Sequence, residues 1–385
     1  MFIPILILRN AFRHKLRTLL TVVGIVVAIA AFGLLRTVVD AWYAGANASS
    51  SARLVTRSSV SLVFPLPLTY AQKIRQLDGV TGVSWANWFG GVYITERNFF
   101  PQFAIDAPSY LDMYPEFILS PEERKAFLTD RRGAIVGRKL ADKYGWNVGD
   151  QIPLRGTIYP GTWTFNLRGI YDGADQGTDT STMFFHFDLL NETIKKMYPR
   201  RADQTGVFIV RLRDPGEAAE VSAAIDLTFK NSLAETLSET EKAFQLSFVA
   251  MTEAILLAIQ AVSFVVIVII MAVMANTMSM TARERSAEYA TLKALGFSNG
   301  FVVMLISAES LGIALLGGLI GIAVTFPIAH AFAGLVGSIL PIFFVSESTV
   351  LMQLGAALLV GVVAAALPAW NTARIRIVDG LRAIA

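Results

Sequence analysis

The segment AILLAIQAVSFVVIVIIMAVMANTMSMTA, residues 254–282, contains no charged side chain. A helix of that length, at about 1.5 Å per residue, covers the roughly 30 Å hydrocarbon core of a bilayer. Charge-free segments also lie at residues 310–346 and 348–373, and a slightly shorter one lies at residues 18–35. The sequence therefore predicts four membrane-spanning helices.

The stretch between the first and second apolar segments, residues 40–248, has a different composition. Charged residues make up only 16% of the chain, below the roughly 25% typical of soluble domains. Most Asp and Glu lie in this stretch, whose length is enough for a core of its own. We therefore expect a membrane protein: an α-helical four-span transmembrane domain with a large α+β extracytoplasmic domain inserted between spans 1 and 2.

Basic residues beside the apolar segments predict the orientation. They form three clusters: Arg9, Arg13, Lys15 and Arg17; Arg283, Arg285 and Lys293; Arg374, Arg376 and Arg382. Because cytoplasmic loops carry an excess of Lys and Arg, all three clusters should lie on the cytoplasmic side, with both termini. The first segment could instead be a cleaved signal peptide, but its apolar run is longer than the usual h-region of about 7–15 residues.

These features divide the chain into predicted segments. They are a cytoplasmic amphipathic N-terminal helix (1–16), transmembrane helices (17–39, 249–280, 301–334 and 350–370), the extracytoplasmic domain (40–248), a cytoplasmic helix (281–300), an extracytoplasmic loop (335–349) and a cytoplasmic tail (371–385). Strand and helix patterns flank both ends of the extracytoplasmic domain. Residues 40–98 and 201–248 are therefore expected to pair into one α+β subdomain, with residues 99–200 as an inserted β-rich subdomain.

Catalytic and metal-binding patterns are missing from the sequence. No G-x-x-x-x-G-K-[ST] phosphate-binding loop occurs, and no G-x-G-x-x-G follows a predicted strand. The chain has no cysteine, and its three histidines are far apart in sequence. We expect a chain that is not an enzyme by itself, holds no cofactor or metal and binds no nucleic acid. The aromatic residues dense between Trp85 and Tyr114 form either a β-rich core or a ligand-binding face.

Two features of the apolar segments are candidates for function or packing. Glu309 lies at or just inside the start of the third span, where a carboxylate is either functional or reaches water or a partner helix. Gly317 and Gly321 form a G-x-x-x-G pattern with Gly312 nearby. Small residues let helices approach closely in lipid, within one subunit or across a dimer.

Three segments carry a resemblance to a known family: LRNAFRHKLRTLLTVVGIVVAIA (8–30), RERSAEYATLKALGFSNGFV (283–302) and PAWNTARIRIVDGLRAIA (368–385). Together they resemble the MacB/FtsX type of ABC transporter permease. The family pattern R-x-x-E-x-A-x-L-[RK]-A-L-G is represented by Arg285, Glu288, Ala290, Leu292, Lys293, Ala294, Leu295 and Gly296, with the first Arg one position off a strict match. Glu309 matches the Glu that opens the family's third span. The run GAIVGRKLADKYGWNVGDQIPLRG (133–156) is similar to the family's periplasmic core domain.

The resemblance implies residues that contact an ATPase. The segment 281–300 would be the coupling helix, ending at Gly296 as a C-cap, with Arg374 and Arg382 in the cytoplasmic tail. Its contacts would come from Arg283, Arg285, Glu288, Leu292, Lys293, Leu295 and Gly296. Glu309, Gly312, Gly317 and Gly321 would pack the helices.

The resemblance also implies partners and a function. A separate ABC ATPase would bind ATP and Mg, and a second permease copy would complete a homodimer or heterodimer, with a periplasmic adaptor or outer-membrane channel as a further partner. ATP hydrolysis would move the extracytoplasmic domain (mechanotransmission) to export or extract an envelope substrate, at the bacterial inner membrane. FtsX-like signalling to an extracytoplasmic hydrolase or sensor, and LolC/LolE-like lipoprotein release, remain alternatives.

Overall fold

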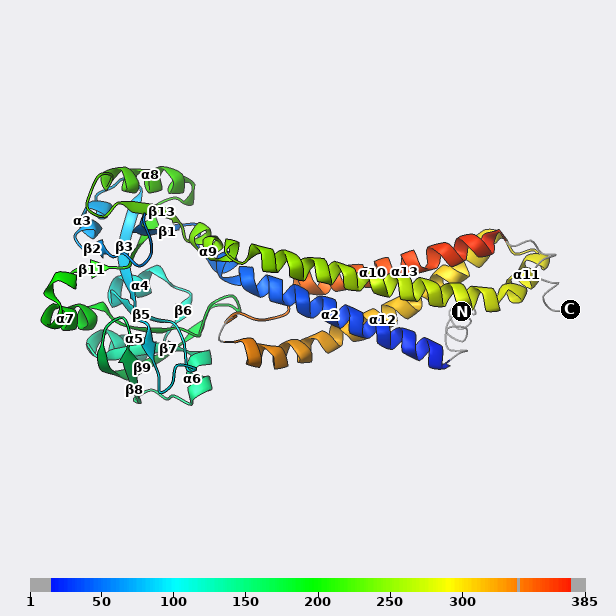
Figure 1. Ribbon diagram of the computed structural model, residues 1–385, viewed down its shortest axis with the longest axis horizontal. Helices are drawn as coiled ribbons and strands as arrows, with labels where there is room; N and C mark the ends of the chain where they lie inside the picture. The colour runs from blue at the N-terminus through cyan, green and yellow to red at the C-terminus, as the bar shows by residue number, and fades with distance from the viewer. Residues whose placement is uncertain (1–14, 338–339, 375–385) are drawn as a thin grey trace. The chain divides into compact units, whose positions relative to one another are not determined.

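The computed structural model describes residues 15–337 and 340–374, which form two compact units (Figure 1). We call the first the helical unit; it takes the chain up to Ala41, Thr252–Leu335, and the chain from Phe343 onward. We call the second the inserted domain; it takes Trp42–Met251 and Val336–Ile342. The short loop predicted at 335–349 is thus divided between the two units. The predicted helix 1–16 lies almost wholly outside the described residues.

Four helices are long and apolar enough to cross a membrane: α2 (Lys15–Ala48), α10 (Glu253–Glu284), α12 (Asn299–Val336) and α13 (Glu347–Ala373). They correspond to the four predicted spans, and most extend several residues beyond the predicted ends. The predicted start of the second span at 249 differs, because a turn at Met251–Thr252 separates α10 from the preceding α9 (Glu241–Ala250). The short helix α11 (Ser286–Ala294) lies between α10 and α12.

Glycines bring α2 and α12 into close contact within one chain. A Cβ atom on Gly317 would lie 2.8 Å from the Ile25 Cβ, and one on Gly321 would lie 3.0 Å from the Ile29 Cβ. The G-x-x-x-G pattern therefore packs α12 against the first span of the same subunit. Among the described residues, a Cβ on Gly312 would meet no atom of another element within 4 Å, so Gly312 takes no part in this contact.

A buried amide joins three of the spans. Gln353 on α13 is fully buried, and its Nε2 donates to the Ile29 carbonyl oxygen of α2 (2.9 Å) and to the Thr325 hydroxyl of α12 (2.8 Å). A Cβ on Gly33 would lie only 2.0 Å from this Nε2. The absence of a side chain at Gly33 thus makes the room that the Gln353 amide occupies.

The inserted domain is built on one long sheet. Its strands are β1 (Arg53–Ser58), β3 (Val80–Trp88), β4 (Gly91–Val92), β5 (Gln102–Ile105), β7 (Gly133–Gly137), β8 (Gln151–Gly156), β9 (Gly161–Gly173), β10 (Met183–His186), β12 (Val207–Leu212) and β13 (Thr236–Thr240). They follow the order β13-β1-β12-β3-β5-β10-β7-β9-β8-β4, and β6 (Phe117–Ile118) pairs with β9. β2 (Leu66–Pro67) and β11 (Gln204–Thr205) form a separate two-stranded sheet.

Short helices cover this sheet (Figure 1). They are α3 (Tyr70–Arg75), α4 (Ala107–Met113), α5 (Pro121–Thr129), α6 (Arg138–Tyr144), α7 (Phe187–Met197), α8 (Ala218–Thr228) and α9, with 3-10 turns η1 (Pro199–Arg201) and η2 (Pro215–Glu217). Local sequence explains their ends: Ser120 and Glu123 form a reciprocal capping box at α5, and Gly145 closes α6 in the left-handed conformation at φ 68°.

Asp130 fixes the turn between α5 and β7. Its carboxylate accepts hydrogen bonds from Asn166 Nδ2 (2.9 Å), Arg168 Nε (2.7 Å) and the Arg132 amide (2.9 Å). Burial alone would raise the pKa of this carboxyl, but the three hydrogen bonds lower it below its ordinary value.

The two flanks of the insert pair with each other, since β1 from the first flank lies between β12 and β13 from the second. The inserted subdomain does not have a separate sheet, because β3 pairs with β5 and β4 pairs with β8. The apolar and β-branched run VTRSSVSLVF (55–64) stays in a strand only to Ser58. After it, the Ser59 amide donates one more bond across to the Glu235 carbonyl oxygen (2.9 Å), and the chain then turns at Ser61–Phe64.

Most aromatic residues between Trp85 and Tyr114 pack in the interior. Phe89 and Phe100 belong to the largest hydrophobic core, and Phe89 meets the Trp163 and Phe185 rings edge to face, at 5.3 and 5.2 Å between ring centroids. The stretch therefore contributes to a core. Phe103, Tyr110 and Tyr114, from the same stretch, also line a pocket.

Candidate coupling site at the end of the helical unit

The site is centred on α11, which begins and ends for local reasons. Arg285, at φ −100° and ψ 13°, breaks the run of α10 and starts α11. At the other end, Gly296 adopts φ 94°, its amide donates to the Lys293 carbonyl, and the Phe297 amide donates to the Leu292 carbonyl. This pair of bonds is a Schellman motif, so Gly296 ends the helix as the sequence predicted.

One face of α11 is anchored inside the chain by charge. Arg285 Nη1 contacts Glu309 Oε2 of α12 at 2.8 Å, and Arg285 Nε contacts Glu288 Oε2 at 2.9 Å. The Arg285 and Glu309 side chains are only 8% and 5% exposed, so this pair lies away from water. The guanidinium also lies 5.2 Å from the ring centroid of Tyr289, which is buried.

The other end of α11 is anchored to α13. Lys293 Nζ donates to the carbonyl oxygens of Thr372 (3.0 Å) and Ala373 (3.1 Å), in the last turn of that helix. A cation at this position satisfies carbonyls that the helix leaves unpaired and interacts favourably with its dipole. The start of α11 is therefore held by the buried Arg285–Glu309 ion pair, and its end is held by the hydrogen bonds from Lys293 to the last turn of α13.

The basic clusters lie at the same end of the helical unit, in the part of the chain that the structure describes. Arg17, near the start of α2, forms an ion pair with Glu284 at the end of α10 (2.9 Å). Lys293 reaches the end of α13, where Arg374 stacks at 4.5 Å on the ring of Trp370. Residues from all three predicted clusters thus meet at one end of the bundle.

The other face of α11 is exposed. Glu288, Thr291 and Leu295 are exposed and follow the i, i+3, i+7 spacing of one helix side. Leu295 is 72% exposed and Phe297, just past the helix, is 45% exposed. Arg283 lines a hollow of about 170 Å³ bounded also by residues of α13. This surface therefore presents apolar and charged groups side by side.

The predicted coupling residues divide between these two faces. Glu288, Leu295 and Arg283 are exposed, whereas Arg285 is turned inward and cannot supply a surface contact. Leu292 packs against a cluster formed by α10 to α13. Leu292 is half-buried in this conformation, and its predicted role as a docking residue stays a prediction.

The structure also gives positions for most of the residues predicted to pack helices or to lie in the cytoplasmic tail. Glu309 was expected to pack helices, and it reaches a partner helix as the counter-ion of Arg285. Gly317 and Gly321 pack against α2, and Gly312 does not. Arg374 lies at the end of α13, and Arg382 is outside the described residues.

Some residues of the site were missed by sequence reasoning. Tyr289 was not singled out, although an aromatic side chain next to the Arg285–Glu288 pattern was a usable signal. Arg17 was named only as a signal for orientation, and its ion pair with Glu284 was not expected. The carbonyls of Thr372 and Ala373 have no sequence signal, because main-chain acceptors are common to all residues. Among the described residues, no group of three or more His, Cys, Asp or Glu could hold a metal ion.

Comparisons with known proteins agree with this architecture. The family profile of the MacB-like periplasmic core domain matches residues 18–227, and that of the FtsX-like permease C-terminal region matches residues 260–377. An uncharacterized ABC transporter permease protein of Mycobacterium tuberculosis, Rv0987, is 26% identical over 219 residues, which are 56% of this chain and 24% of that protein. The chain therefore spans much less than the full length of this relative.

Two solved structures show similarity to about half of this chain. The extracellular domain of the transporter YknZ from Gram-positive bacteria is 13% identical, with a TM-score of 0.36, and the match covers 49% of this chain and 100% of that one. The periplasmic region of MacB from Actinobacillus actinomycetemcomitans is 7% identical, with a TM-score of 0.38, covering 52% and 94%. On the strength of the two family profiles, the chain belongs to the ABC transporter permeases that join a MacB-like periplasmic core domain to an FtsX-like transmembrane region.

Proposed function

We propose that this permease couples ATP hydrolysis by a separate cytoplasmic ATPase to movement of its inserted domain. The observation that carries the proposal is the double anchoring of α11, by Arg285 to Glu309 of α12 and by Lys293 to the end of α13. A force applied to the exposed face of α11 would reach two spanning helices without a flexible intermediate. The work done on the inserted domain would be export or extraction of an envelope substrate.

The proposed orientation follows from the basic residues at one end of the helical unit. Because Lys and Arg accumulate on the cytoplasmic side, that end and α11 would face the cytoplasm, and the inserted domain would lie outside the bacterial inner membrane. Both termini would then be cytoplasmic. ATP and Mg would be bound by the partner ATPase, for which this chain supplies a docking surface. A second permease copy would complete the assembly.

FtsX-like signalling to an extracytoplasmic hydrolase would use the same coupling step. LolC/LolE-like lipoprotein release would do so too. The three candidate functions, export or extraction, signalling and lipoprotein release, differ in what the inserted domain acts on. They share the same role for α11. A test of α11 therefore addresses the part that they share.

The experiment changes the exposed face of α11 and leaves its buried face intact. Leu295→Asp puts a charge on the docking surface at a position that is already 72% exposed, so the fold should be unaffected. Leu233→Asp, at a fully exposed position in the inserted domain, is the matched control. We expect Leu295→Asp to reduce co-purification with the cognate ATPase and to remove the permease's effect on ATPase turnover in nanodiscs.

The control should behave as wild type in both assays. Wild-type ATPase binding and turnover by Leu295→Asp would show that α11 is a connecting helix without a docking role. Loss of binding in both variants would indicate a general effect of the added charge, and would count equally against the proposal.

A further inference from the structure

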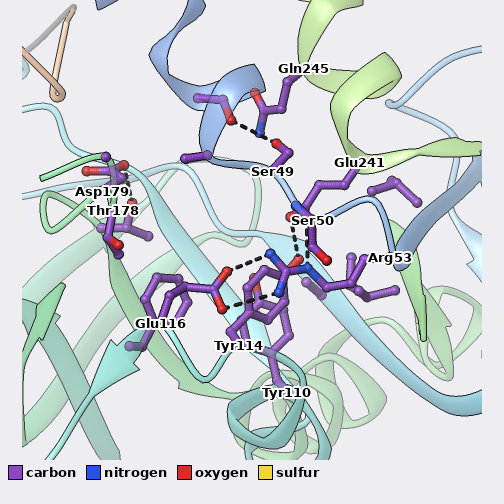
Figure 2. Close-up of a pocket in the computed structure, with 18 of the residues that line it drawn as sticks. Ser49, Ser50, Arg53, Tyr110, Tyr114, Glu116, Thr178, Asp179, Glu241 and Gln245 are labelled. Atoms are coloured by element: carbon purple, nitrogen blue, oxygen red, sulfur yellow. Dashed lines mark hydrogen bonds and ion pairs between the residues drawn. The ribbon is translucent and has the colours of Figure 1, made fainter. Parts of the chain in front are cut away.

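The inserted domain contains a pocket of about 530 Å³ that the coupling function does not use (Figure 2). It is bounded by the sheet, by the end of α2, by α9, and by the loops after α4 and after β9. Its volume falls within the roughly 300–1,000 Å³ of small-molecule sites. All of the residues that line it belong to the inserted domain.

Aromatic side chains form part of the wall of the pocket. Six rings line it, contributed by Phe103, Tyr110, Tyr114, Phe117, Phe184 and Phe244. Tyr110 and Tyr114 stack at 4.5 Å between ring centroids, and Tyr114 stacks on Phe117 at 5.4 Å. Burial raises the pKa of both tyrosines, so their rings stay neutral. Aromatic faces of this kind attract apolar groups and cations.

The charges in the pocket are unequal. One cation, Arg53, faces four carboxylates, those of Glu116, Asp175, Asp179 and Glu241. Arg53 contacts Glu116 Oε1 at 2.5 Å and Glu241 Oε2 at 2.7 Å, and its guanidinium lies 4.2 Å from the Tyr114 ring centroid. Arg53 therefore offsets only part of the negative charge of the two glutamates it binds.

The loop after β9 supplies the remaining negative charge. Asp175 and Asp179 accept hydrogen bonds from their own loop, for example from the Gly177 amide (2.9 Å) and the Ser181 amide (2.7 Å). In Figure 2, Asp179 and Thr178 lie across the pocket from Arg53 and Glu241. Among the residues that line the pocket, Arg53 is the basic one, and its ion pairs are with Glu116 and Glu241 rather than with either aspartate.

We propose that this pocket binds an organic cation with an apolar body, such as a hydrophobic amine. The excess of carboxylates attracts the positive charge, and the rings cover the apolar part. A metal ion is a poorer fit, because no group of three or more His, Cys, Asp or Glu among the described residues could hold one. The inference is independent of energy coupling, since it concerns only the inserted domain.

The test uses the full chain in phosphatidylcholine nanodiscs and benzyltributylammonium as the probe. Isothermal titration calorimetry, with empty nanodiscs subtracted, should detect saturable binding to one site per chain. Asp175→Asn combined with Asp179→Asn should weaken that binding about tenfold, as expected for charges several ångströms from the ligand near a protein surface. The control, Asp142→Asn combined with Asp188→Asn, removes two exposed charges of the same domain outside the pocket and should not change binding.

Two measurements on the wild-type chain keep the proposal testable if the loop variant misfolds. Binding of the cation should weaken as the salt concentration rises, because screening reduces the attraction. 4-Butylbenzenesulfonate, an anion of similar apolar character, should not compete. Absence of saturable binding, tight binding of the sulfonate, or equal loss in the pocket and control variants would overturn the proposal.

Discussion

The buried Arg285–Glu309 pair allows a quantitative test of the coupling site. We consider Arg285→Met, Glu309→Leu and the double variant, each of which replaces a charged side chain by an apolar one of similar size. The two side chains are 8% and 5% exposed. Removing one partner of such a pair leaves the other charge buried, which costs about 3–5 kcal/mol.

The two single variants should not be equal. Glu309→Leu leaves Arg285 its contact with Glu288, whose side chain is 42% exposed, so the loss should lie at the lower end of that range. Arg285→Met removes both side-chain hydrogen bonds and should cost more. The double variant leaves no buried charge at either position and should return to within about 1 kcal/mol of wild type.

The assay is unfolding of the purified chain by sodium dodecyl sulfate in mixed micelles, followed by far-UV circular dichroism. Both single variants should also lose the permease's effect on ATPase turnover, because the start of α11 is no longer held by α12. If the single variants unfold within about 0.5 kcal/mol of wild type, the range of an ordinary surface substitution, the pair is not a structural anchor. A double variant no better than Arg285→Met would lead to the same conclusion.

Three further predictions concern packing and pH. Gly33→Ala should destabilise the wild-type chain by about 1–3 kcal/mol through overpacking. The loss should be clearly smaller when Gln353 is replaced by Ala, because the closest clash is with that amide and the next, with Thr325 Cγ2, is at 3.0 Å. A double-mutant cycle in the same unfolding assay decides it, and equal effects in both backgrounds would contradict it. Gly317→Ala should destabilise the bundle, because the added Cβ meets α2. Gly312→Ala should be neutral or slightly stabilising, because its Cβ meets no neighbouring helix among the described residues. Equal losses of stability at both positions would contradict intrachain packing at Gly317. The lowered pKa of Asp130 stabilises the inserted domain above the ordinary value of 3.8, and this contribution is lost as the pH falls below it. Thermal melts of the full chain at several pH values should therefore show a shallower acid loss for Asp130→Asn than for wild type, and identical pH dependence would refute this.

The spanning helices could be predicted from the sequence because uncharged runs long enough to cross a bilayer are rare in soluble proteins. The ends of these helices could not be predicted from the sequence. For example, α2 continues to Ala48, well past the end of its apolar run, and enters the inserted domain as a helix. The end of α11 could be predicted at Gly296, since a left-handed residue is needed there and glycine adopts that conformation without strain.

The interior of the coupling site could not be predicted. A basic residue beside a membrane span indicates orientation and says nothing about burial. The neighbouring sequence does not distinguish Arg283, which is exposed, from Arg285, which is buried. The difference comes from Glu309, 24 positions away, whose carboxylate accepts a hydrogen bond from Arg285 only once the chain has folded. For the same reason, Leu292 and Leu295 looked equivalent although only Leu295 faces outward.

The continuous sheet of the inserted domain also could not be predicted from the sequence. β5 has four residues and β4 has two, and both lie in a region of turn signals. Strands this short have little periodicity, and their pairing with β3 and β8 depends on contacts distant in sequence. The pocket follows from the same long-range arrangement, because its lining comes from both flanks of the insert and from the segment between them.

The most direct test of the account is whether nucleotide state moves the inserted domain through α11. The chain has no cysteine, so spin labels can be placed at Glu122→Cys on α5 and at Ser298→Cys after α11 without background. Pulsed electron–electron double resonance on the complex with the ATPase should give different distance distributions with ADP and with a non-hydrolysable ATP analogue plus Mg. The difference should disappear in Leu295→Asp and persist in Leu233→Asp. The same distribution in both nucleotide states of the wild-type complex, or an unchanged response in Leu295→Asp, would contradict the central claim.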